Sequence, residues 1–446
     1  MGKKVAKFGG TSVADGIQLR KTKNIIEADK DLKYIVVSAP GKRFSQDNKI
    51  TDLLYLCRAS MEHNLPYEQL FQVVIDRFMA VKASIGVTVD MEHEFQDIKE
   101  HMAKGCSEDY VASRGEYLNA VLMAAYLGYD FVDTQGLVLF DDRGRLLIEE
   151  TNEALKEELA KHENAVLPGF YGSDIETGEI KTFSRGGSDI TGALVARAVD
   201  ADVYENWTDV PGFLIADPRI VDNPNPINRI SYKELRELSY MGASVLHEDA
   251  IYPARIASIP INIRDTNEPE LPGTFITNEP DDEGKHIITG IAGSRDFTVI
   301  ALYKSLMRQE RGFFRRIFAI LDDFDISFEH LPSGIDTISV VISNKNLDGK
   351  LEDLLEAFRV QLNPDSMEYY ENIALIATVG NRMNRKPGVA ARLFNCLAEA
   401  DVNIRMIDQG SSEINIIVGV ENKDFEKAIK AIYNEFETEN NEGENN

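Results

Sequence analysis

The stretch "VAKFGGTSVAD", residues 5–15, decides how the first half of the chain is interpreted. A short apolar run ends in Gly9 and Gly10, and the hydroxyl residues Thr11 and Ser12 follow before a segment of helical period. Glycine lets a backbone approach a phosphate closely, and free N–H groups at a helix N-terminus attract anions. Lys7 adds the cation that phosphoryl transfer requires. The stretch predicts either a phosphate-binding loop or an ordinary turn in which Thr11 or Ser12 caps a helix.

A second glycine loop, "FSRGGSD" at residues 183–189, also precedes a helical segment. Two such loops in one α/β domain are expected to meet at the carboxyl ends of the strands, where open sheets bind ligands. The guanidinium group of Arg185 can donate two parallel hydrogen bonds to a carboxylate. Alternatively, Arg185 is a surface charge. Asp189 is expected to orient Lys7 or to hold a metal, or alternatively to interact with the helix dipole.

Two further stretches carry candidate binding residues. In "ENWTDVPGFLIADPR", residues 205–219, a structural turn is the stronger interpretation, while a nucleotide site would place Thr208 and Asp209 near the ribose or adenine and Arg219 near phosphate. In "SRGEYLNA", residues 113–120, Glu116 either complements a helix dipole or binds an ammonium group inside a cleft.

Composition limits the possible functions. The 446 residues hold 74 acidic and 48 basic side chains, a net charge of −26 that disfavours binding to nucleic acid or anionic membranes. Three scattered cysteines, without CxxC spacing, suggest neither a disulfide framework nor a zinc site. No apolar run approaches the ~20 residues of a membrane span, and the N-terminus has no signal-peptide pattern, so we expect a cytoplasmic protein.

The pattern of apolar runs predicts an α/β domain over residues 1–280. Short strands such as "KYIVVSA", "YDFVDT", "NAVLPGF" and "ADVYENW" alternate with helical segments, which favours a mainly parallel sheet with helices on both faces. The clearest helices are "QLRKTKNIIEADKDL", "RGEYLNAVLMAAYLG" and "SDITGALVARAVDA". Prolines, glycines and acidic residues predict a linker near residues 266–286.

The second half of the chain contains an internal repeat. At a constant offset of 76 residues the segment that begins "VIALYKSLMRQERGFF" falls on "LIATVGNRMNRKPGVA", and pairs such as Gly312 and Gly388 are identical. Each copy predicts a βαββαβ order. The acidic tail, residues 437–446, is expected to be disordered and to supply no last strand for the second copy. We therefore expect residues 286–293 to complete a module with 372–436, so that the first module, residues 294–371, is an insertion within the second.

Together, "KFGGTS", "SRGGSD", "WTDVPG" with "DPR", and the tandem repeat resemble the aspartokinases of the amino-acid kinase family. The resemblance implies an amino-acid kinase fold, an αβα sandwich, followed by two ferredoxin-like ACT modules. It implies transfer of phosphate from ATP, with Mg²⁺, to L-aspartate, giving 4-phospho-L-aspartate in the first step of lysine, threonine and methionine biosynthesis. Since the chain ends after the second repeat and has no GxGxxG, no fused homoserine dehydrogenase is expected.

The family's roles transfer to matching positions. The resemblance assigns phosphate binding and transition-state stabilisation to Lys7, Gly9, Gly10 and Thr11, and orientation of the lysine to Asp189. It assigns aspartate binding to Thr51, Glu116, Arg185 and Ser188, with Glu116 on the α-ammonium and Arg185 on the α-carboxylate, and nucleotide binding to Thr208, Asp209 and Arg219. No metal ligand is assigned. Two positions depart from the family pattern: Leu214 stands where many relatives have tyrosine, and Ser244 where many have lysine. Both positions lie on the nucleotide side in the family, so the departures bear on nucleotide affinity and not on the assigned reaction.

The repeats imply regulation by an end-product amino acid at a dimer interface. L-Lysine is the expected effector and L-threonine the competing one, in a homodimer or a dimer of dimers formed through the ACT modules. Glu329 is the candidate for the effector's ammonium group, and the full candidate set is Met307, Gly312, Phe313, Phe314, Ser327, Phe328 and Glu329. Alternatively, Glu329 is an acidic residue of a helix and Gly312 is a glycine required for packing. Another amino-acid kinase and a non-catalytic amino-acid sensor are the rival functions.

Overall fold

The computed structural model describes residues 2–184, 186–242, 248–279 and 287–442, with the side chains of 248–249 and 438–442 left aside. The chain divides into two compact units, which are described separately. The first comprises Met1–Phe213, Pro226–Lys233 and Ser244–Asp281, and the second comprises Leu214–Asn225, Glu234–Ala243 and Asp282–Asn446. The second unit therefore takes two segments from within the predicted domain 1–280.

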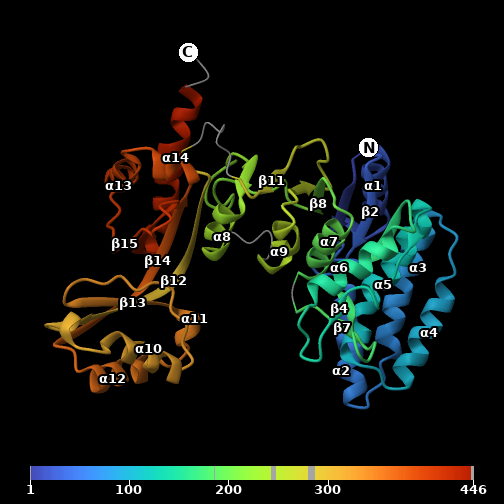
Figure 1. Cartoon of the computed structure of the whole chain (residues 1–446), viewed down its shortest axis with the longest axis horizontal. Helices are drawn as coiled ribbons and strands as arrows, with labels where there is room; N and C mark the ends of the chain where they lie inside the picture. The colour runs from blue at the N-terminus through green and yellow to red at the C-terminus, as the bar shows by residue number, and fades with distance from the viewer. Residues whose placement is uncertain (1, 185, 243–247, 280–286, 443–446) are drawn as a thin grey trace. The chain divides into compact units, whose positions relative to one another are not determined.

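An eight-stranded sheet forms the centre of the first unit, in the order β3-β5-β2-β1-β8-β10-β11-β9 (Figure 1). Its strands pair in parallel except β10 with β11, as the mainly parallel prediction requires. Buried valine, isoleucine and alanine residues fill the central strands because helices cover both faces. The strands are β1 Lys4–Phe8, β2 Leu32–Val37, β3 Asp130–Phe131, β5 Ala165–Pro168, β8 Val203–Thr208, β9 Arg229–Ser231, β10 Ile261–Asp265 and β11 Thr274–Thr277.

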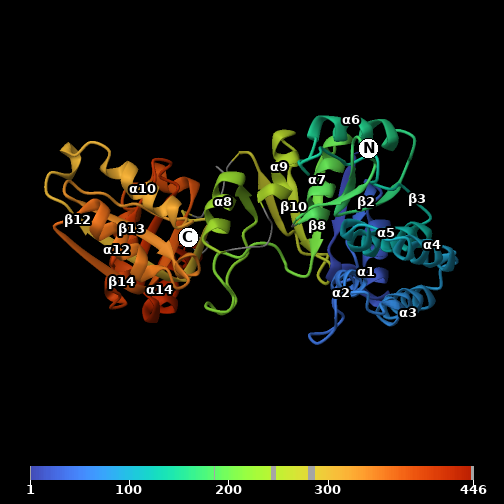
Figure 2. The same ribbon diagram turned by 90° about the horizontal axis from the view of Figure 1, so that it is seen from below.

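Two helical layers sandwich this sheet (Figure 2). Helix α7 packs on β1, β2 and β8 with α6 and α9 beside it, while α5 packs on β2 and β5 from the other face together with α1 to α4. The helices are α1 Gly16–Ala28, α2 Ile50–Glu62, α3 Glu68–Ile85, α4 Met91–Ala103, α5 Glu108–Leu127, α6 Ile148–Leu159, α7 Gly187–Ala198 and α9 Glu248–Ile256; α8 spans Tyr232–Tyr240. The first unit also contains a separate three-stranded sheet. Its strands are β4 Leu139–Phe140, β6 Tyr171–Asp174 and β7 Ile180–Thr182.

The second unit is built on one five-stranded sheet, in the order β13-β12-β14-β16-β15. Its strands are β12 Gly290–Tyr303, β13 Thr337–Ser343, β14 Ser366–Val379, β15 Met406–Asp408 and β16 Asn415–Glu421. Its longer helices are α10 Phe313–Asp323, α12 Leu351–Leu362, α13 Val389–Glu399 and α14 Phe425–Glu442, with the one-turn α11 at Asn344–Leu347.

The two long strands β12 and β14 serve both copies of the repeat. The second half of β12 pairs with β13 and with the first half of β14, whereas residues Gly290–Ser294 pair with Val379–Leu375 in the second half of β14, next to β16. The strand that precedes the first copy therefore lies in the sheet at the edge of the second, which is the pairing that the insertion hypothesis requires.

Two boundary predictions were wrong. The expected linker 266–286 contains β11, whose Phe275 and Ile276 pair with β10 and β9 in the main sheet. The expected disordered tail is helical as far as Glu442, because Phe436 and Glu437 are buried and Asn225 donates a hydrogen bond to the Glu437 carboxylate. Residues 443–446 lie outside the described residues. Among the helices that the structure describes, none combines the length and apolar character that crossing a bilayer demands.

Candidate active site

The loop after β1 forms a short helical turn at the carboxyl edge of the sheet. Gly9 is extended and donates its N–H to the carbonyl oxygen of Trp207, at 2.9 Å, and a 3₁₀ turn follows over Gly10–Val13. The first N–H groups of such a turn have no acceptor within it. Helix α1 is capped instead by Asp15, which accepts from two backbone N–H groups, so neither Thr11 nor Ser12 is its N-cap.

Lys7 and Asp189 meet beside this loop. The Lys7 Nζ atom lies 2.6 Å from Asp189 Oδ1, and the Asn206 amide donates to the same oxygen at 2.8 Å. Lys7 is only 7% exposed, and a Cβ atom on Gly9 would lie 3.6 Å from its Nζ. The ammonium group is therefore fixed at the glycine loop, and Asp189 and Asn206 orient it. Sequence reasoning did not single out Asn206, although its place in β8 opposite Lys7 in the β1 register puts both side chains on one face.

Gly10 is required for close contact with a second loop. The Gly41 N–H donates to the Gly10 carbonyl oxygen at 2.8 Å, and a Cβ atom on Gly10 would lie 2.9 Å from the Ala39 carbonyl oxygen. Because this neighbour is backbone, a side chain at position 10 has no room. Sequence reasoning also did not single out Gly41, whose signal was a Pro-Gly pair directly after the "KYIVVSA" strand.

Glu116 brings a buried carboxylate to the same region. It is 5% exposed in α5, and the backbone N–H of Ala39 donates to it, while its Oε2 atom has no hydrogen-bond partner among the described residues. Burial raises the pKa of Glu116 to about 8, against the lowering effects of its hydrogen bonds and of Arg114. An ammonium group at this position would donate a hydrogen bond to Oε2 and compensate the buried negative charge. The ionised form of Glu116 is therefore stabilised by a bound cation.

The second glycine loop leads into α7. Gly186 has φ +60°, a conformation that favours glycine, and α7 then begins at Gly187, with Asp189 in its first turn. Ser188 is buried against Gly169, whose added Cβ atom would lie 2.6 Å from the serine Cβ. The predicted carboxylate-binding Arg185 lies outside the described residues.

The remaining predicted residues fall at separate places. Thr51 lies in the first turn of α2, directly after Ile50, whose N–H donates to Pro40. Thr208 ends β8 and donates its hydroxyl to Asp209, at 3.2 Å. Arg219 belongs to the second unit, where it pairs with Asp217 at 2.6 Å.

Of the two departures from the family pattern, Leu214 also lies in the second unit, and Ser244 lies outside the described residues.

The candidate effector residues all lie in the first module of the second unit. Met307 and Phe313 are buried in its hydrophobic core, Gly312 precedes α10 with φ +77°, and Phe314 and Phe328 are exposed. Ser327 is exposed too, and Glu329 accepts a hydrogen bond from the Tyr240 hydroxyl. The exposed members and Glu329 are the ones that a ligand can reach.

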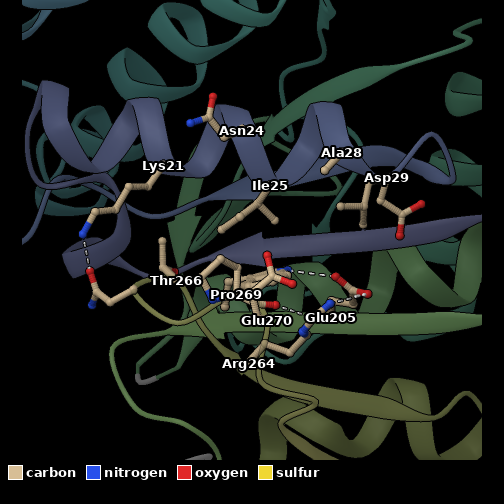
Figure 3. Close-up of a pocket in the computed structure, with 13 residues that line it drawn as sticks. Lys21, Asn24, Ile25, Ala28, Asp29, Glu205, Arg264, Thr266, Pro269 and Glu270 are labelled. Carbon is tan, nitrogen blue, oxygen red and sulfur yellow. Dashed lines mark hydrogen bonds and ion pairs between the residues drawn. The ribbon is translucent and has the colours of Figure 1, made fainter.

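A separate cavity of about 410 Å³ lies on the opposite face of the sheet from Lys7 (Figure 3). Its walls include Ile25 from α1, Glu205 and Trp207 from β8, and Arg264 from β10. Glu205 alternates with Asn206 along β8, so it faces away from the Lys7–Asp189 pair. The described residues contain no cluster of three or more metal-ligating side chains.

Comparison with known proteins supplies the family. Residues 2–265 match the model of the amino acid kinase family, and residues 376–436 match an ACT domain. Aspartokinase 3 of Bacillus subtilis is 36% identical over 97% of this chain and 98% of its own. This chain is an aspartokinase of the amino acid kinase family.

Solved structures support the same assignment. The aspartate kinase of Clostridium acetobutylicum is 50% identical, with a TM-score of 0.91 over 98% of this chain and all of its own length. Aspartokinase III of Escherichia coli, 26% identical over 97% of this chain and 99% of its own, has been solved with aspartate and ADP, at a TM-score of 0.71, and with lysine and aspartate, at 0.74. The amino-acid kinase fold and the ACT architecture of this aspartokinase agree with the predicted fold class.

Proposed function

We propose that this aspartate kinase transfers the γ-phosphoryl group of ATP to the side-chain carboxylate of L-aspartate, giving 4-phospho-L-aspartate and ADP. The carboxylate oxygen attacks phosphorus while the bond from phosphorus to the bridging oxygen of ADP breaks. An aspartate side chain, with a reference pKa of ~3.9, is already ionised at neutral pH, so the step needs no general base. The product would enter lysine, threonine and methionine biosynthesis.

The observation that carries this proposal is the position of Lys7. Its ammonium group lies at the glycine loop, held at 2.6 Å by Asp189. Two anions must be brought in line for the reaction, and a fixed cation with backbone N–H groups stabilises the charge on the transferring group. Gly9, Gly10 and Thr11 supply the backbone of that cradle in the proposal.

Aspartate binding is assigned to the opposite side of the turn formed by Ala39 and Gly41. Glu116 would bind the α-ammonium group, for which its unpartnered Oε2 atom is suited. Arg185 would bind the α-carboxylate, with Ser188 and Thr51 completing the substrate site. Thr208 and Asp209 are proposed to bind the nucleotide.

Mg²⁺ fits this site as a companion of the nucleotide. It is commonly held by one or two carboxylates together with substrate phosphates, and the described residues offer no larger acidic cluster. Bound in this way it would neutralise phosphate charge during transfer. Asp189 is the carboxylate that pairs with Lys7 beside the proposed phosphate position, and its Oδ1 atom is engaged by Lys7 and Asn206.

Regulation is proposed to act through the ACT modules. The Escherichia coli relative solved with lysine and aspartate supports L-lysine as the effector. L-Threonine stays the alternative effector. An effector that prefers an inactive arrangement shifts the population toward it. The exposed Phe314, Phe318 and Phe328 form an apolar patch on the first module that supports dimerisation there.

An assay of ADP release tests the reaction. Aspartate, glutamate and acetylglutamate are compared, and hydroxylamine traps any acyl phosphate as a hydroxamate. Release with aspartate alone, accompanied by hydroxamate, agrees with the proposal. Release with glutamate or acetylglutamate instead would favour another amino-acid kinase, and no release with any of them would favour a non-catalytic sensor. Lysine and threonine are then titrated into the same assay.

A further inference from the structure

Helix α8 presents one line of polar side chains to the second unit. Glu234, Glu237 and Tyr240 are spaced by three residues, so they share one face of the helix. Each of the three side chains is held by a residue from the ACT modules, and α8 from Glu234 onward belongs to the second unit.

Two of these contacts bind α8 to the second module. Glu234 is 3% exposed and accepts from the Thr289 hydroxyl at 2.6 Å and from the Asn381 N–H at 2.8 Å. Glu237 accepts from the side-chain amide of Asn415 at 2.5 Å. All three partners lie at one end of the sheet, where β12 and β16 begin and β14 ends.

The third contact reaches the first module. The Tyr240 hydroxyl, at the last residue of α8, donates to Glu329 Oε2. Burial and the neighbouring Glu329 carboxylate raise the pKa of Tyr240, so the hydroxyl stays protonated and remains a donor at neutral pH. The same carboxylate is the group proposed above to bind the ammonium group of an amino-acid effector.

We propose that Tyr240 occupies the ammonium subsite at Glu329 in the effector-free chain, so that effector binding must displace it and release the end of α8. This rests on the effector role of Glu329 in the proposed function. The Tyr240 hydroxyl already satisfies Oε2 of the carboxylate that the ammonium group would approach, so the bond to Tyr240 weakens effector binding and favours the uninhibited arrangement. The chain leads from the end of α8 to α9 of the first unit, so the end of α8 is one of the chain connections between the second unit and the kinase unit.

Inhibition curves of the full chain test the competition. Tyr240→Phe removes only the hydroxyl, and Tyr369→Phe removes the same atom from another exposed tyrosine of the second unit. We expect Tyr240→Phe to lower the lysine concentration for half-inhibition by about threefold to tenfold. A buried hydrogen bond to a charged group would give a larger change, but Tyr240 is 61% exposed. Its uninhibited turnover should stay within about twofold of wild type, as should both properties of Tyr369→Phe. An unchanged or raised half-inhibition concentration in Tyr240→Phe overturns the proposal while leaving the proposed function intact.

Hydrogen exchange of the backbone amides of residues 232–242 tests the contact between Tyr240 and Glu329, whichever amino acid is the inhibitor. Exchange is expected to be faster in Tyr240→Phe and Glu329→Gln than in wild type, and lysine should accelerate it in wild type alone. If neither lysine nor threonine inhibits the wild-type chain, the proposed regulation fails. Equal exchange in wild type and both variants then overturns the Tyr240 contact as well, whereas faster exchange in both variants supports it.

Discussion

At the scale of single residues, one strand places two lysines in opposite roles. Lys4 and Lys7 both belong to β1, yet their side chains leave on different faces of the sheet. Lys4 pairs with Asp29 at 2.7 Å and with the buried Glu205 at 3.4 Å, beside the cavity of Figure 3. Lys7 instead pairs with Asp189 at the glycine loop, so only Lys7 is available to a phosphoryl group.

We expect Lys7→Ala to lower kcat for aspartate by about 100- to 1,000-fold, the cost of removing one fixed donor from a charged transition state. Lys4→Ala, from the same strand, should keep turnover within about threefold of wild type. It should lose about 1–3 kcal/mol of folding stability, because the buried Glu205 loses one cation while Arg264 remains. Steady-state kinetics and circular dichroism of both variants provide the comparison. Equal losses of turnover in the two would show that the strand, and not the Lys7 ammonium group, matters.

The proposed role of Glu116 implies that aspartate binding depends on pH. Burial raises the pKa of its carboxyl to about 8, so the group is mostly protonated at pH 7 in the free protein. A bound ammonium group lowers this pKa, so binding releases a proton and affinity rises as the pH increases toward 8. Calorimetry in phosphate and in Tris should therefore give different apparent enthalpies, because the two buffers take up the released proton with different heats.

The Glu116→Gln variant should bind aspartate at least about tenfold more weakly, as expected when a charge-assisted bond is lost. It should also give the same enthalpy in both buffers. Identical enthalpies for the wild-type chain would remove the ammonium role of Glu116.

At the scale of elements, the candidate site is built where two loops meet helix α5. The turn at Ala39 and Gly41 lies between the Gly10 loop and Glu116, since Gly10 packs on its backbone and Glu116 accepts from its Ala39 N–H. Gly115 in α5 is also close, because its added Cβ atom would lie 2.8 Å from that of Ala39. The loop after β2 thus separates the loop at Gly10 from the Glu116 carboxyl group.

Gly9 and Gly10 should respond differently to alanine. A methyl group on Gly10 would lie 2.9 Å from the Ala39 carbonyl oxygen, and that backbone must move, at a cost of about 1–3 kcal/mol. On Gly9 its nearest neighbours are at 3.5 and 3.6 Å, which is ordinary contact, and φ is −67°. Thermal unfolding should place Gly10→Ala well below wild type and Gly9→Ala close to it. Equal midpoints for the two variants would contradict the packing argument.

Sequence reasoning predicted the helices and strands themselves better than it predicted which strands and loops contact one another. Strand and helix periods gave β1, β2, β8, α1, α5 and α7, because buried faces impose period 2 or 3.6 on the sequence. The strand β11 was missed because four residues among prolines and acids carry no clear period, and its burial depends on pairing with β10 and β9. Asn206 and Gly41 were missed for a related reason, since their importance comes from neighbours distant in the sequence.

At the scale of the molecule, the repeats form one sheet through shared strands. Because β12 and β14 each run through both modules, two continuous strands join the sheet of one module to the sheet of the other. The apolar patch on the first module, where Phe318 stacks on Phe328 at 5.6 Å, remains exposed in the single chain. A patch of this kind is typical of an interface between copies.

We expect Phe318→Glu to give the mass of one chain in light scattering where the wild type gives two or more, because a charge in the patch resists burial. Ile175→Glu, which adds the same charge to an exposed apolar position of the first unit, should leave the mass unchanged. The Phe318 variant should also lose inhibition by lysine. A wild-type chain that is itself monomeric would contradict the proposed interface.

The most direct test of the central claim is a crystal structure of the chain with ADP and L-aspartate. The account predicts the β-phosphate within hydrogen-bond distance of Lys7 Nζ and of the Gly10 or Thr11 N–H, with the aspartate ammonium group on Glu116. A diphosphate bound away from residues 7–12, with aspartate not in contact with Glu116, would contradict it.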